Sequence, residues 1–129
     1  FAGEAMRRPL FDLWQRAADV YKSIKAEVDY AQAAGGLGET LVELHRAAQA
    51  IAPLETSLEI AQRRDQPFLR DIQLYLAEAL WDGGGDRTRA VTLAKAARAA
   101  YLQDKTPAPE LAVVTAWLAA HAPATSKTP

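Results

Sequence analysis

The sequence predicts an all-α protein built from antiparallel helical hairpins. Alanine, leucine, glutamate, glutamine and arginine dominate the chain, and these residues favour helices. Valine, isoleucine and threonine are scattered, and no alternating run is long enough for a strand. Apolar residues instead recur at spacings of three and four, in segments separated by glycine and proline. Because short turns join such segments into stacked hairpins, we expect about five helices.

The first predicted helix runs from about Pro9 to Ala33. Its apolar residues alternate at spacings of four and three, which is typical of a helix that buries one face. This stripe consists of Leu10, Trp14, Ala17, Tyr21, Ile24, Val28 and Ala31. Gly35, Gly36 and Gly38 are expected to end the helix and to form a turn.

The second predicted helix begins near Thr40, a residue type that caps helix N-termini well. Pro53 then interrupts the pattern, and two interpretations remain open. Either a new helix starts at this proline, or one long helix kinks there and continues to about Arg64. The kink is favoured, because no capping residue precedes Pro53. The two helices together form the expected N-terminal hairpin, residues 9–64.

The third predicted helix, residues 68–82, is apolar on two faces. Ile72 and Leu76 belong to its main stripe, whereas Leu74 and Trp81 lie on the far side. A helix with two apolar faces is normally sandwiched between neighbours, or it exposes one face to a ligand.

A glycine turn, Gly83–Gly85, ends the third helix, and Asp86 is predicted to cap a fourth helix that reaches about Gln103. The stripe of this helix is rich in alanine, which allows a close approach to the helix before it. Its members are Ala90, Leu93, Ala94, Ala97, Ala100 and Tyr101. Residues 68–103 therefore form a second predicted helix pair.

Pro107 and Pro109 introduce a fifth predicted helix, residues 110–121. The remaining tail, residues 122–129, is polar and has prolines near both ends, so we expect it to be disordered. The sequence thus predicts a single helical domain over residues 1–121.

The stretch LAEALWDGGGDRTRAVTLAKAARAAY, residues 76–101, resembles a tetratricopeptide repeat. The packing positions of that family's two helices fall here on Leu76, Ala77, Leu80, Ala90, Ala94 and Ala97. Two features depart from the family pattern: the turn with three glycines is one residue longer, and Ala94 replaces a larger side chain.

The resemblance covers the C-terminal part of the chain well and the rest loosely. A fainter upstream copy places Gly36 at the turn and carries Leu41, His45, Ala48 and Pro53. Residues 110–121 are similar to the capping helix of such arrays. The chain also resembles the C-terminal repeat region of bacterial multidomain regulators, including eukaryotic-like serine/threonine kinases. This resemblance implies a right-handed stack of hairpins that acts as an interaction module in a signalling protein.

In tetratricopeptide domains the first helix of each repeat lines a concave surface that binds the ligand. The matching positions here are Asp71, Leu74, Glu78 and Trp81. The resemblance implies that these residues form a partner-binding site. Its two apolar and two acidic side chains suit a peptide ligand that carries an apolar anchor residue next to a basic residue. The alternative interpretation is that Trp81 packs on the preceding hairpin.

Three basic residues, Arg87, Lys95 and Arg98, share one arc of the fourth predicted helix. This arc lies opposite the alanine stripe. It is either a solvated helix surface or a docking patch for an acidic peptide.

The sequence argues against several classes of function. The net charge is −1, from 15 basic and 16 acidic residues, whereas nucleic-acid binders usually have a basic excess. The chain has no cysteine, and no Asp, Glu or His cluster has metal-ligand spacing. After Gly83–Gly85 comes Asp86, where a phosphate-binding loop needs lysine and serine or threonine. We therefore expect no enzymatic activity, no cofactor and no metal. We expect no membrane insertion either, because no run of about 18 apolar residues occurs.

Three functions remain as hypotheses. The first is a non-catalytic module that binds a peptide or helix of a partner protein. The second is a structural bundle that self-associates into a homo-oligomer through the heptad-like stripe of the first helix. The third is a regulatory domain of a larger signalling protein. Burial of Leu74 and Trp81 against the first helix would favour the bundle, and an open groove lined by them would favour the module. Because the chain begins with Phe1, we expect a fragment of a longer, cytoplasmic protein.

Overall fold

The computed structural model describes residues 2–122, with side chains from Arg7 onward. Within this part all regular secondary structure is α-helical, which confirms the all-α prediction. The helices are α1 (Ala2–Ser23), α2 (Glu27–Glu43), α3 (Ala47–Arg63), α4 (Leu69–Asp82), α5 (Arg87–Tyr101) and α6 (Pro109–His121). The predicted disordered tail lies, apart from Ala122, outside the described residues.

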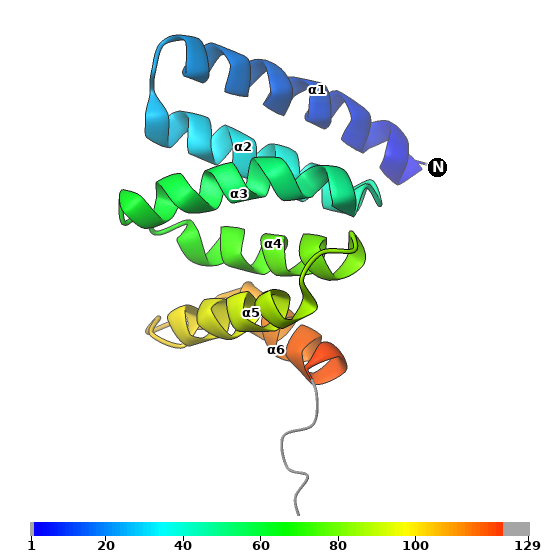
Figure 1. Ribbon diagram of the computed structural model, residues 1–129, viewed down its shortest axis with the longest axis vertical. Coiled ribbons are helices and arrows are strands. Elements are labelled where there is room, and N and C mark those ends of the chain that lie inside the picture. Colours follow the sequence, from blue (N-terminus) through cyan, green and yellow to red (C-terminus); the bar gives the residue numbers. More distant parts are fainter. Residues whose placement is uncertain (1, 123–129) are drawn as a thin grey trace, which may run out of the picture.

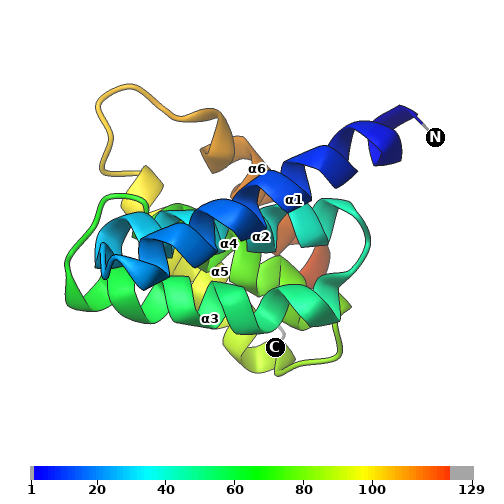
Figure 2. The ribbon, with the colours of Figure 1, turned by 90° about the horizontal axis from the view of Figure 1, so that it is seen from above.

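Successive helices run antiparallel and stack one on the next from α1 to α5 (Figure 1). The last helix, α6, lies on the side of α2 and α4, away from α3 (Figure 2). In the N-terminal half α2 is the central element, because it contacts α1, α3 and α4. One continuous hydrophobic core runs through the stack, from Leu37 in α2 to Val114 in α6.

The single helix predicted over residues 9–33 is wrong, because the chain turns sharply between α1 and α2. Lys25 has a φ of 60°, and the Ala26 amide donates back to the Tyr21 carbonyl at 3.0 Å. The same left-handed turn ends α2 at His45 (φ 61°) and α3 at Asp65 (φ 50°). Glycine normally marks this kind of helix end, and none of these three residues is a glycine. The breaks therefore carried no strong local signal.

The turn predicted at Gly35, Gly36 and Gly38 is also wrong, because all three glycines lie inside α2. A side chain at Gly36 would collide with the indole of Trp14 in α1, and one at Gly38 would collide with Leu54 in α3. These glycines let the neighbouring helices approach closely and do not terminate the helix.

Pro53 lies inside α3, which runs through it without interruption. The favoured continuous helix is confirmed, and a new helix starting at this proline is excluded. That continuous helix begins at Ala47, however, because the chain turns between Glu43 and Ala47. Thr40 is a buried residue of α2 with 2% of its surface exposed, not an N-cap. The predicted hairpin over residues 9–64 thus contains three helices.

Helix α4 is sandwiched, as its two apolar faces predict. Ile72 and Leu76 on one face and Leu74 and Ala77 on the other are all buried. The neighbours are α3 on one side and α5 on the other, with α2 also in contact. Asp86 caps α5 as predicted, since its carboxylate accepts a hydrogen bond from the Arg89 amide at 3.1 Å.

Polar contacts join both adjacent and more distant helices of the stack. The buried Ser57 hydroxyl in α3 donates to the Ala31 carbonyl in α2 at 2.7 Å. Arg89 at the start of α5 forms a two-point ion pair with Glu55 in α3. These polar contacts add to the apolar core in tying α3 to α2 and to α5.

Candidate functional site

A hollow of about 300 Å³ opens between α2, α4 and α6. We call it the acidic groove, because four of its lining residues are glutamates. It is lined by Glu39, Val42, Glu43, Leu74, Tyr75, Glu78, Glu110 and Val113. These residues come from three helices that are not consecutive in the chain, so only the stacking of the hairpins brings them together.

The base of the acidic groove is apolar. Leu74 is 2% exposed, and Val42 is half-buried beside it. Val113 of α6 stands at the rim, where 50% of its surface is exposed. The hydroxyl of the half-buried Tyr75 donates a hydrogen bond to Glu39, and burial raises the pKa of Tyr75 above its usual range. The base thus offers an apolar contact for a ligand side chain.

Negative charge is concentrated around this base. Burial, together with the nearby carboxylates of Asp82, Glu39 and Glu43, raises the pKa of Glu78 to about 7. Burial also raises the pKa of Glu39, although the hydrogen bond from Tyr75 opposes this effect. A raised carboxyl pKa means that the folded protein disfavours the ionised form. A cation placed in the groove would therefore be bound favourably.

A cation of α1 lies near the rim of the groove. Arg7 of α1 approaches Glu43 at 3.3 Å, but both side chains are 42% exposed. Such an exposed pair contributes little free energy, because water screens it. It does not neutralise Glu78, whose carboxyl pKa stays raised.

The structure divides the four predicted partner-binding residues. Leu74 and Glu78 line the acidic groove. Asp71 is half-buried and accepts a hydrogen bond from the hydroxyl of Tyr101, which ties α4 to α5. Trp81 does not line the groove.

Trp81 packs instead on the last helix. Its ring lies edge-on to Trp117, with 5.6 Å between ring centroids, and edge-on to His121 at 4.9 Å. Trp117 and His121 stack on each other at 4.3 Å. The Arg87 guanidinium covers the Trp81 ring at 4.5 Å from its centroid. This aromatic cluster holds α6 against the end of α4. Helix α6 in turn forms the third wall of the acidic groove.

Several groove residues were missed by sequence reasoning. Glu39, Val42 and Glu43 belong to one face of α2, at a helical spacing of three and one. Because a turn was predicted at the α2 glycines and the next helix was started near Thr40, these three residues were not recognised as one helix face. Glu110 and Val113 lie on α6, which was expected only to cap the last repeat. No local signal shows that α6 turns this face towards α2.

Two of the three predicted basic-patch residues, Arg87 and Lys95, come together in a second hollow of about 470 Å³. We call it the basic pocket. It is lined by Trp81, Arg87, Thr88, Val91, Thr92, Lys95 and His121. Arg98 lies elsewhere, because its guanidinium donates to the Thr115 hydroxyl of α6 at 3.1 Å.

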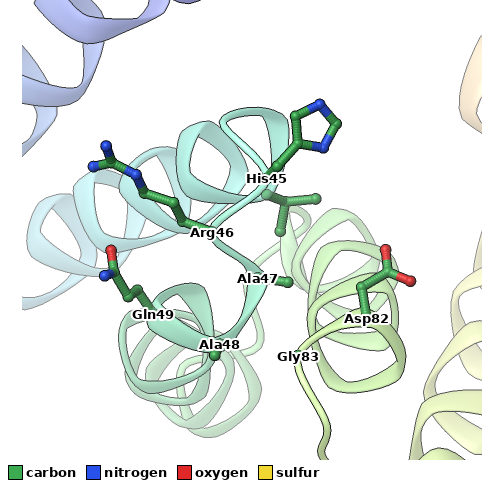
Figure 3. Close-up of a pocket in the computed structure, with 8 residues that line it drawn as sticks. His45, Arg46, Ala47, Ala48, Gln49, Asp82 and Gly83 are labelled. Atoms are coloured by element: carbon green, nitrogen blue, oxygen red, sulfur yellow. The ribbon is translucent and has the colours of Figure 1, made fainter.

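A third hollow, of about 580 Å³, lies between the α2–α3 turn and the end of α4 (Figure 3). His45 and Asp82 stand on opposite sides of it, and Arg46 points away from Asp82 (Figure 3). Ala47 and Ala48 are also among its lining residues. One imidazole and one carboxylate with no nucleophile beside them do not make a catalytic arrangement.

Among residues 2–122, no group of three or more His, Asp or Glu side chains is placed to hold a metal ion. None of the described helices combines the length and the apolar character needed to cross a membrane. Comparison of the chain with family models, curated proteins and solved structures gave no match.

Proposed function

We propose that this chain is a non-catalytic interaction module that holds a peptide or helix of a partner protein in the acidic groove. The observation that carries the proposal is a hollow with an apolar base and acidic walls, built by α2, α4 and α6. Its position extends the tetratricopeptide resemblance, because in that family the first helices of successive repeats line the ligand-binding surface. Each of the three helices contributes at least one glutamate and at least one apolar or aromatic side chain to the same hollow.

The chemistry of the groove favours a ligand with an apolar side chain next to lysine or arginine. The apolar side chain would rest on Leu74 and Val42, and the cation would reach Glu78 and Glu39. Because the pKa of Glu78 is raised to about 7, binding of a cation would favour its ionised form and release a proton near neutral pH. A half-buried ion pair is also screened less by water than an exposed pair.

The proposal is tested with an amphipathic peptide of alternating lysine and leucine blocks, measured by calorimetry at pH 8, where Glu78 is largely ionised. We expect Glu78→Gln and Glu39→Gln each to weaken binding by about 2–10-fold, because each removes one charge contact. The matched control is Glu59→Gln, the same chemical change on the outer surface of α3, where this side chain is 63% exposed.

Two outcomes would contradict the proposal. The peptide fails to bind saturably, or Glu59→Gln weakens binding as much as Glu78→Gln does. A second peptide, with serine in place of leucine, separates the apolar contribution from the charge. If it binds as tightly as the first, the apolar base of the groove takes no part.

A second candidate function is self-association through α1. Three large apolar side chains on this helix and one just after its end are exposed: Leu10 at 39%, Leu13 at 60%, Val20 at 56%, and Ile24 at 63%. This outer face includes Leu10 and Ile24 of the predicted stripe, whereas Trp14 of that stripe packs against the core. We propose that this face joins two copies of the chain, independently of the acidic groove.

A further inference from the structure

The basic pocket is separate from the acidic groove. It lies between the first turns of α5 and the ends of α4 and α6, and no carboxylate is among its lining residues. The two hollows use opposite ends of the last helix: Glu110 faces the acidic groove, whereas His121 lines the basic pocket. The stacking therefore sorts the surface charges into two sites of opposite sign.

The cations of the basic pocket differ from three other arginines of the stack. Arg63, Arg70 and Arg89 each form an ion pair with a carboxylate of another helix or loop. In contrast, neither Arg87 nor Lys95 forms an ion pair within the part of the chain that the structure describes. Arg87 lies over the ring of Trp81, and Lys95 is exposed one turn beyond Val91. Both charges remain available to a ligand.

The rest of the pocket is rigid and partly apolar. The Nδ1–H of His121 donates to the Trp117 carbonyl at 2.8 Å, since a carbonyl oxygen can only accept. The His121 ring is further held by its contacts with Trp81 and Trp117. Trp81 and the half-buried Val91 supply an apolar surface beside the two cations. Because these groups are already fixed, a ligand would not pay for ordering them.

We propose that the basic pocket binds an acidic segment of a partner protein, with carboxylates on Arg87 and Lys95 and an apolar side chain on Trp81 and Val91. Charge complementarity favours this ligand. A nucleic acid presents a continuous row of phosphates and needs a broad basic surface. Here the net charge is −1, and the acidic groove, which shares α6 with this pocket, would repel a long polyanion.

The test uses an acetylated, amidated peptide of alternating glutamate and leucine blocks, titrated into the ¹⁵N-labelled chain. We expect saturable NMR shifts at the Trp81 indole N–H and at the amides of Arg87 and Lys95. Lys95→Gln should weaken binding by about 2–5-fold, the range expected for one exposed charge contact, and Lys95→Glu should weaken it further. Because no described residue forms a side-chain hydrogen bond or ion pair with Lys95, neither change should affect folding.

The matched control is Lys105→Gln, the same change at an exposed lysine in the α5–α6 loop, which lies outside the pocket. Affinity should not change. The proposal is overturned if shifts at these sites are absent up to about 1 mM peptide, the weak-binding limit. It is equally overturned if Lys105→Gln and Lys95→Gln weaken binding to the same extent.

Two further ligands complete the test. A peptide with glutamine in place of glutamate should not bind, and a single-stranded oligonucleotide that binds these residues more tightly than the acidic peptide would overturn the choice of a protein ligand. The lysine–leucine peptide of the groove experiment should shift Glu39 and Tyr75 instead. Saturating either site should leave the other unchanged, so failure of one proposal is distinguishable from failure of the other.

Discussion

Glu78 sits half-buried on α4, where the carboxylates of Glu39, Glu43 and Asp82 act on it together. Burial and these charges raise its pKa from the ordinary 4.5 to about 7. In the unfolded chain the ordinary value applies, so the folded protein binds a proton that the unfolded chain releases between these two values. The contribution of Glu78 to stability is therefore complete below pH 4.5 and is lost as the pH rises through 7.

This linkage predicts the effect of Glu78→Gln. At pH 8 the variant should be more stable than the parent, on the order of 1–3 kcal/mol, because one pKa unit corresponds to about 1.4 kcal/mol. At pH 4 the two should be nearly equal. Urea unfolding at pH 4, 6 and 8 measures the difference. A constant difference across this range would show that Glu78 keeps an ordinary pKa.

The same substitution should weaken binding of the basic peptide while it stabilises the free protein. Opposite signs for stability and affinity are typical of a residue retained for function. A substitution of Leu74 cannot separate an effect on binding from an effect on stability in this way. Leu74 is buried at 2% exposure, and removing its atoms costs about 2–5 kcal/mol, so truncating it together with Trp81 would disturb the fold as well as the groove.

At the scale of the elements, the glycines of α2 set how closely the N-terminal helices approach. Gly36 accommodates Trp14 of α1, and Gly38 accommodates Leu54 of α3. Alanine is the better helix former by about 1 kcal/mol, so helix propensity alone would select against both glycines. Close packing against two neighbours therefore outweighs propensity in this helix.

Gly38→Ala should accordingly destabilise the protein, by about 1–3 kcal/mol, because its methyl group would overlap Leu54 in a fully buried position. Thermal or urea unfolding measures the change. Gln32→Ala, at an exposed position of the same helix, serves as the control and should stay within about 0.5 kcal/mol of the parent. If Gly38→Ala stabilises the protein instead, propensity dominates, and α2 and α3 lie farther apart.

The turns between the elements are regular. The left-handed residues Lys25, His45, Asp65 and Gly84 follow one another at intervals of 20, 20 and 19 residues. Two successive helices thus occupy about one unit of 40 residues, which is longer than the tetratricopeptide period of about 34. The hairpins keep a constant length even where the tetratricopeptide packing residues are weakest.

At the scale of the whole molecule, the stack presents three distinct surfaces: the acidic groove, the basic pocket and the exposed apolar face of α1. The first two share α6, which the cluster of Trp81, Trp117 and His121 holds in place. The third lies at the other end of the stack (Figure 1). A ligand in either charged site should therefore leave α1 free to contact a second copy.

Self-association through α1 predicts a monomer–dimer equilibrium that is visible by sedimentation velocity. Leu13→Asp and Ile24→Asp should each shift it to monomer, because a charge on the exposed stripe opposes its burial. Asp12→Asn, on another face of α1, is the control and should not change the equilibrium. A wild-type chain that stays monomeric at about 1 mM would rule out this function.

The sequence by itself determined the fold class and the C-terminal half of the helix order. Pro109, the glycine turn after α4 and the Asp86 cap are local signals, so α4, α5 and α6 begin and end within two residues of their predicted bounds. These signals act through the backbone of the residue itself and its nearest neighbours. They need no knowledge of what packs against the helix.

Only the tertiary structure decided where α1 and α2 part and which residues meet in the acidic groove. From the sequence alone, a glycine inside a helix predicts a turn. Only the structure shows that Gly36 instead makes room for the indole of Trp14 on the neighbouring helix. The raised pKa of Glu78 likewise depends on Glu39, which belongs to a different helix and is brought near by stacking alone. Both are properties of contacts between distant segments, and the local sequence carries no record of such contacts.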